Sequence, residues 1–138
     1  MKIQKMFRGK RKDNGEWIYG NLTVWSDGGA SIDQEPTEAS PLYAVVEETV
    51  GQGSTVVDKN DVEMYEGDVI YGAVCWLERY RPAVVAFRNG SFGLLWYRGD
   101  VEEFNPFTSL CNVQYEIVGN VFDNPELLRT PQNDEARE

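Results

Sequence analysis

Carboxylates recur through the stretch DKNDVEMYEGDVI, residues 58–70, at a spacing that could hold a cation or supply a general acid and base. It contains five acidic side chains and one lysine. A helix-loop-helix calcium loop needs a glycine at its sixth position and a bidentate glutamate at its twelfth, and this stretch has neither. Asp58 and Asn60 favour a turn, because their side chains bond nearby backbone amides. Since polar residues then alternate with apolar ones, the stretch indicates a turn leading into a half-solvated strand.

The other residues capable of catalysis do not form a recognisable group. Glu47-Glu48 and Glu102-Glu103 are adjacent pairs, and neighbours on a strand point to opposite faces, which favours solvated surfaces over shared sites. The chain has no histidine, which removes Ser-His and Cys-His arrangements and most zinc sites. Cys75 and Cys111 stand among apolar residues, as buried thiols do. We therefore expect no catalytic residue, no cofactor and no metal, and a protein that is not an enzyme.

Charge is unevenly distributed along the chain. The net charge is −10, yet six of the 13 basic residues lie within the first twelve positions. From Asp13 onward seven basic residues face all 23 acidic ones, a balance of −16, so most of the surface repels nucleic-acid phosphates.

Two nucleic-acid hypotheses follow from this distribution and stay open. Lys10, Arg11 and Lys12 could form a local phosphate-binding patch, although an edge strand protected by lysines explains the same residues more simply. The acidic body could mimic DNA and inhibit a host DNA-binding protein, although ordinary acidic solubility is the simpler explanation.

The elements that must position these residues are short strands. Period-two alternation dominates, and Asn14-Gly15 and Asn89-Gly90 each predict a hairpin with a two-residue turn. The pattern predicts a mainly β (α+β overall) chain with an N-terminal β-hairpin subdomain at 1–50, a small barrel at 51–128 and a flexible polar tail at 129–138. No apolar run approaches the roughly 20 residues that span a bilayer, and no signal peptide is recognisable, so we expect a cytoplasmic protein without membrane contact.

Several short motifs in this order resemble the YopX family, whose members are encoded by bacterial phages and prophages. They lie at 50–52, 58–60, 65–69 and 115–128, and the opening KIQKMFRG…EWIYGNL is similar as well. The resemblance covers about 1–128 and implies an α+β N-terminal portion and an SH3-like C-terminal barrel. It implies no activity. Asp61 departs from the family's pattern, which more often has glycine in this turn.

A binding role is the main functional expectation. The chain has 17 aromatic residues, more than a small core readily hides, and such side chains are favoured in protein interfaces. Within WLERYRP, residues 76–82, we expect partner contacts from Trp76, Arg79, Tyr80 and Arg81. The sequence thus predicts a phage or prophage accessory protein that binds a host or phage protein. It also predicts a homo-oligomer formed through the N-terminal hairpin or 76–82.

Overall fold

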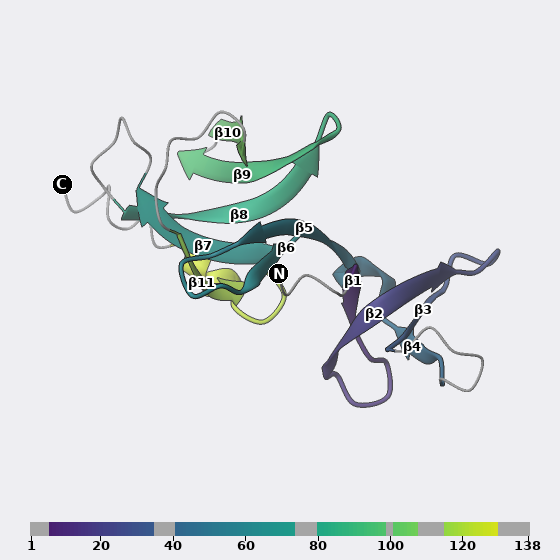
Figure 1. Ribbon diagram of the computed structural model, residues 1–138. Helices are drawn as coiled ribbons and strands as arrows, with labels where there is room; N and C mark the ends of the chain where they lie inside the picture. Colours follow the sequence, from purple (N-terminus) through teal and green to yellow (C-terminus); the bar gives the residue numbers. More distant parts are fainter. Residues whose placement is uncertain (1–5, 35–40, 74–79, 99–100, 108–114, 130–138) are drawn as a thin grey trace. The chain divides into compact units, whose positions relative to one another are not determined.

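The computed structural model of the chain describes residues 6–34, 41–73, 80–98, 101–107 and 115–129 (Figure 1). Two compact units divide the chain between Thr55 and Val56. The sequence prediction placed its division at Gly51, at the start of the strand β5 (Gly51–Val57), which carries the chain from the first unit into the second. Trp76, Arg79, Cys75, Cys111 and most of the predicted tail lie outside the described residues.

The first unit is built from short antiparallel strands. Its elements are β1 (Phe7–Lys10), β2 (Trp17–Val24), β3 (Ala30–Asp33), β4 (Tyr43–Val45), the 3₁₀ turn η1 (Glu47–Thr49) and the start of β5. In the first sheet the strand order is β4-β3-β2-β1-β5, followed by β6 (Glu63–Tyr65). Alternating residues of these strands, among them Ile18, Ile32 and Val45, form the core of the unit. Each such side chain contributes about 1.5–3 kcal/mol by leaving water.

The N-terminal hairpin forms as predicted, but its turn is longer than the expected two residues. Arg11 N donates to Glu16 O and Gly15 N to Arg11 O, both at 2.9 Å, so four residues separate the last paired positions. Of Asn14 and Gly15, only Gly15 has a positive φ, of 75°. Asn14 instead accepts a hydrogen bond at Oδ1 from Glu16 N, which is the local bonding that competes with a two-residue turn.

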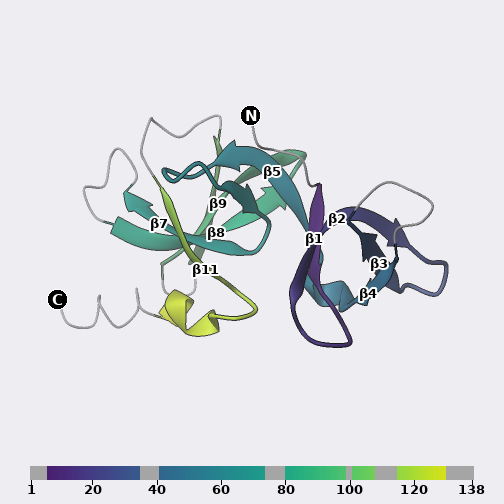
Figure 2. The ribbon, with the colours of Figure 1, turned by 60° about the horizontal axis from the view of Figure 1, so that its bottom comes forward.

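The second unit contains a five-stranded antiparallel sheet of order β10-β9-β8-β7-β11 (Figures 1 and 2). Its strands are β7 (Asp68–Ala73), β8 (Tyr80–Arg88), β9 (Ser91–Arg98), β10 (Val101–Pro106) and β11 (Glu116–Asn120), and η3 (Pro125–Arg129) follows. Asn89 and Gly90 both have positive φ, 54° and 81°, which confirms the two-residue turn predicted between β8 and β9. Phe87 and Phe92 pair across this hairpin, with ring centroids 4.8 Å apart.

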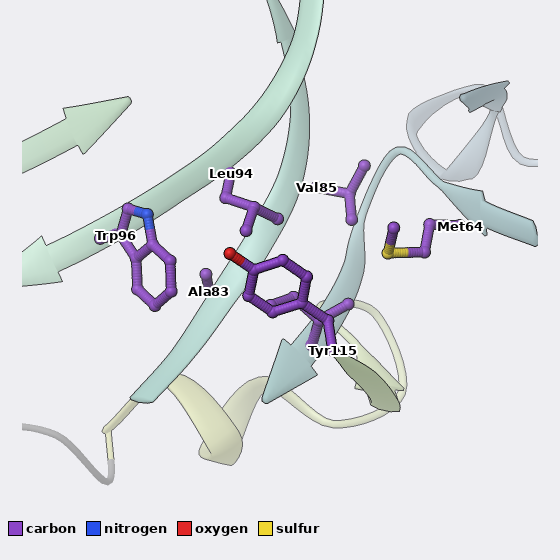
Figure 3. Close-up of a cluster of buried hydrophobic side chains, with 7 residues drawn as sticks. Met64, Ala83, Val85, Leu94, Trp96 and Tyr115 are labelled. Atoms are coloured by element: carbon purple, nitrogen blue, oxygen red, sulfur yellow. The ribbon is translucent and has the colours of Figure 1, made fainter. Parts of the chain in front are cut away.

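The main core of the second unit lies on one face of this sheet. Figure 3 shows members of it gathered around the Tyr115 ring. The buried residues are Met64, Ile70, Ala83, Val85, Leu94, Trp96 and Tyr115. Tyr115 packs directly on Gly72, where any Cβ atom would overlap its ring.

The opposite face of the sheet is buried as well. Val69, Val84 and Leu95 lie side by side in the register of β7, β8 and β9, and none is more than 8% exposed. The short helix η3 contacts β8. Burial on both faces explains why β8 and β9 read as nearly continuous apolar runs, AVVAF and FGLLWY.

The prediction of a mainly β chain is confirmed. The expected SH3-like barrel is not, because the described strands form two antiparallel sheets and no closed barrel, with β10 and β11 at opposite ends of the second sheet. None of the helices in the described part of the chain has the length and apolar character that crossing a bilayer requires.

Candidate functional site

Asp58, the first carboxylate of the acidic stretch, is a structural residue of the second unit. It is 7% exposed, and its Oδ1 atom accepts hydrogen bonds from Asn60 N at 2.8 Å and Val62 N at 3.0 Å. Its Oδ2 atom accepts a third from Ile117 N at 3.1 Å. The Asp58 carboxylate therefore closes its own turn and also holds β11.

Asp68 performs a similar task at the start of β7. It is 3% exposed, and its Oδ2 atom accepts a hydrogen bond from Tyr65 N at 2.8 Å. Gly67, with φ of 91°, makes the reversal that brings the two residues together. Asp61 also has a positive φ, of 68°, so an aspartate occupies the left-handed turn position where glycine is more usual.

Of the two glutamate pairs, only Glu102-Glu103 lies on a strand as expected, whereas Glu47-Glu48 lies in the 3₁₀ turn η1. Glu47 lies in η1, where its Oε2 atom is 3.5 Å from Lys12 Nζ. Glu102 and Glu103 lie on β10 opposite Tyr97 and Trp96, so their side chains point to different faces, as expected. Over the ranges that the structure describes, no group of three or more Asp, Glu, His or Cys residues could hold a metal ion.

The three basic residues of the predicted phosphate patch have partners within the first unit. Arg11 Nε and Nη2 donate to the two carboxylate oxygens of Asp13 at 2.9 and 2.6 Å, and this bond lowers the pKa of Asp13. The Arg11 guanidinium also lies 4.0 Å from the Tyr43 ring centroid. Lys12 pairs with Glu47, and Lys10 lies over the Trp17 ring. Two of the three positive charges are thus compensated locally, which weakens the case for a phosphate patch.

Of the predicted partner-binding residues, Tyr80 and Arg81 begin β8, where they stand opposite Ala73 and Gly72 of β7. Trp76 and Arg79 lie outside the described ranges, so partner binding by these four residues stays a prediction.

Sequence reasoning placed a sheet edge wrongly: it interpreted the lysine-rich opening as an edge strand, whereas β1 lies between β2 and β5. An edge strand presents unpaired backbone groups to which another chain can bind. The two sheets end in four strands, β4, β6, β10 and β11. The alternation signal locates strands but does not reveal which of them stand at an edge.

Three of these four edges are occupied by the chain itself or are very short. At β4, Lys12 N donates to Ala44 O and Val46 N to Lys10 O. At β11, Lys59 N donates to Tyr115 O while Ile117 N donates to Asp58. The strand β6 has three residues, and its Tyr65 N already donates to Asp68.

The fourth edge, β10, differs from the other three. Among the described residues, only β9 pairs with it. Figure 1 shows β10 at the margin of the sheet beside β9. Val101, Glu102 and Glu103 are exposed, Val101 by 64%. This strand is our candidate interaction site.

The backbone of β10 can be oriented from its register. Pro106 stands opposite Gly93 and has no N–H to donate, so this pair is one of the non-bonded positions of the antiparallel ladder. Such positions alternate along a strand, which makes Phe104 and Glu102 non-bonded as well. The N–H and C=O groups of these two residues therefore point away from β9.

Two buried polar atoms stand out in the core of the second unit. Trp96 Nε1 and the Tyr115 hydroxyl have no hydrogen-bond partner among the described residues, although Trp96 and Tyr115 are only 7% and 8% exposed. Figure 3 shows the Tyr115 hydroxyl turned toward the side of the cluster that holds Leu94. Burial raises the pKa of this hydroxyl above its ordinary value.

Comparison with known proteins places the chain in a family. The model of the YopX protein family matches residues 6–129. The crystal structure of yopX from Bacillus subtilis is similar, with a TM-score of 0.60 at 18% identity over 89% of this chain and 97% of that one. Protein EF1440 from Enterococcus faecalis is also similar, with a TM-score of 0.52 at 22% identity over 91% of this chain and 98% of that one. No curated protein matches. The family match extends over most of the chain, and this protein therefore belongs to the YopX family.

Proposed function

We propose that this chain is a phage-type accessory protein that acts by binding another protein and not by catalysis. The observation that carries the proposal is the contrast between the edges of the second sheet. The β11 edge is capped by Asp58 and Lys59, whereas β10 pairs with β9 alone among the described residues. An open edge is a common route by which a sheet binds an extended segment of another protein.

The use of the buried carboxylates supports the same proposal. Asp58 and Asp68 bond to backbone amides of their own unit, so the acidic motifs have a structural task. An SH3-like barrel in the second unit is a finer part of the proposal, supported by short antiparallel strands and the glycine reversal before β7. Action inside the bacterial host is a further part, supported by family membership.

Affinity capture tests the proposal. The tagged full chain should retain a specific protein from a lysate of a bacterial host. Glu102→Pro should lose that protein because it removes an outward N–H from β10, whereas the matched variant Glu102→Ala, which keeps the N–H, should retain it. Failure of the folded wild-type chain to enrich any protein above an unrelated tagged control would contradict the proposal.

A further inference from the structure

The chemistry of β10 indicates what kind of segment it binds. We propose that β10 takes up, by strand addition, an extended basic segment of another protein. That segment would carry a lysine or arginine two positions away from an apolar residue. The inference rests on the proposed function and specifies the partner.

Charge is the first reason. Glu102 is already engaged, with its Oε2 atom 3.6 Å from Arg88 Nη1. Glu103 is exposed and has no ion pair within the described part of the chain. A cation opposite or diagonal to Glu103 on an added strand would supply one, and cross-strand pairs of opposite charge stabilise a ladder by about 0.2–1 kcal/mol.

The pleat of the strand is the second reason. Val101 and Glu103 are two positions apart, so they lie on the same face of the sheet. The exposed Val101 side chain would pack against an apolar residue of the added strand, and Glu103 would face a basic one. The outward backbone groups of Glu102 and Phe104 would form the hydrogen bonds.

A second copy of this chain is a poorer occupant for this edge. Antiparallel pairing of two β10 strands would bring the two glutamates of each copy into one short ladder, and like charges directly opposite are destabilising. The net charge of −10 on each chain also makes two copies repel each other.

A defined peptide tests the proposal without knowledge of the natural partner. The probe is a blocked, fluorescently labelled peptide, Lys-Thr-Val-Thr-Lys-Thr-Val-Thr, titrated with the full-length protein while anisotropy is recorded. Controls are the peptide with glutamate in place of lysine and a peptide of equal charge with proline in place of threonine, which cannot pair as a strand.

We expect saturable binding of the lysine peptide alone. Glu103→Lys should weaken it about two- to thirtyfold, since it replaces a favourable cross-strand pair with a repulsive one. Glu102→Pro should abolish it, whereas Glu102→Ala should retain it. Circular dichroism and the thermal midpoint establish that each variant is folded.

Four outcomes would overturn the inference: no binding of the lysine peptide, equal binding of the proline peptide, insensitivity to both Glu102→Pro and Glu103→Lys, or a doubled mass that disappears in Glu102→Pro. If the lysine peptide fails while a lysate protein is still captured in a manner sensitive to Glu102→Pro, the partner chemistry is wrong and the proposed function stands.

Discussion

Asp58 Oδ2 accepts a hydrogen bond from the amide of Ile117, a residue 59 positions further along the chain, at 3.1 Å. The same carboxylate closes its own turn through Asn60 N and Val62 N. One side chain thereby fixes the turn before β6 and covers the edge of β11. The acidic motif of the family therefore has a structural role in this chain.

Asp58→Ala should therefore destabilise the protein strongly. It removes three charge-assisted hydrogen bonds made by a buried carboxylate, so we expect the free energy of unfolding to fall by about 3 kcal/mol. Urea unfolding followed by circular dichroism measures this loss. Asp61→Gly, in the same turn at a positive φ, should be neutral or slightly stabilising. A loss below about 1 kcal/mol for Asp58→Ala would contradict the structural role.

Tyr115→Phe should leave stability unchanged or raise it by about 1 kcal/mol at neutral pH. The change removes a buried hydroxyl that has no described partner and keeps the ring on Gly72. Tyr115→Leu is the control that distinguishes the ring from the hydroxyl. It removes both, and we expect it to lower the free energy of unfolding. Thermal or urea unfolding of both variants measures these changes in stability. A clear loss of stability in Tyr115→Phe would show that the hydroxyl forms a hydrogen bond in solution.

The same residue predicts a stability loss in alkali. Burial raises the folded-state pKa of Tyr115 above the ordinary value of 10.0, while the unfolded chain ionises at that ordinary value. Ionisation of Tyr115 therefore does not affect the free energy of unfolding below about pH 10, and it lowers that free energy as the pH rises further. Burial, and then the charge of Glu102, raises the pKa of Tyr97 in the same direction. Unfolding free energies from pH 8 to 11 should fall less steeply in Tyr115→Phe than in the wild type, and identical slopes would argue against the burial of Tyr115.

Gly72→Ala should destabilise the second unit, because its Cβ atom would overlap the Tyr115 ring. Overpacking of this kind typically costs about 1–3 kcal/mol. Tyr115→Ala in the same chain should relieve most of the added cost, so the two changes should be strongly non-additive in a double-mutant cycle of unfolding free energies. Strict additivity would mean that the two residues are not in contact.

The basic N-terminal residues should bind nucleic acid poorly. Arg11 is paired with Asp13 and Lys12 with Glu47, so we expect no gel shift of DNA by the wild-type chain at micromolar concentration and low salt. Asp13→Asn combined with Glu47→Gln frees both cations and should strengthen any binding. A gel shift by the wild-type chain that disappears when Lys10, Arg11 and Lys12 are replaced by alanine would support the hypothesis of a phosphate-binding patch.

Homo-oligomer formation is a separate prediction from the sequence, and light scattering coupled to size exclusion measures it. A dimer that persists in Glu102→Pro would use a surface other than β10, in agreement with the expected contacts at the N-terminal hairpin or 76–82. A mass near 15.7 kDa across a tenfold range of concentration would exclude the dimer.

Local patterns predicted much of the fold. The alternation and the Asn89-Gly90 turn located β8 and β9, since both signals depend on residues close together in the chain. The two-residue turn at Asn14-Gly15 was wrong because Asn14 bonds to Glu16, a choice that the dipeptide does not reveal. Asp58 was correctly assigned to a turn, but its bond to Ile117 depends on tertiary contacts over 59 positions.

The candidate site was harder to predict for the same reason. Whether β10 lies at an edge depends on the order of strands in the sheet and not on the residues of β10 itself. Its sequence, VEEFNP, reads as an ordinary polar strand. The ion pair between Lys12 and Glu47 was likewise invisible, because Glu47 approaches Lys12 only in the folded unit.

Amide hydrogen exchange along β10, read residue by residue by NMR, tests the central claim most directly. An open edge predicts that the outward amides of Glu102 and Phe104 exchange about tenfold or more faster than those of Glu103 and Asn105, which face β9. The amide of Ile117, covered by Asp58, should be protected although β11 also ends the sheet. Equal protection of all four β10 amides would show that the edge is already covered, and would contradict the claim that it is the binding site.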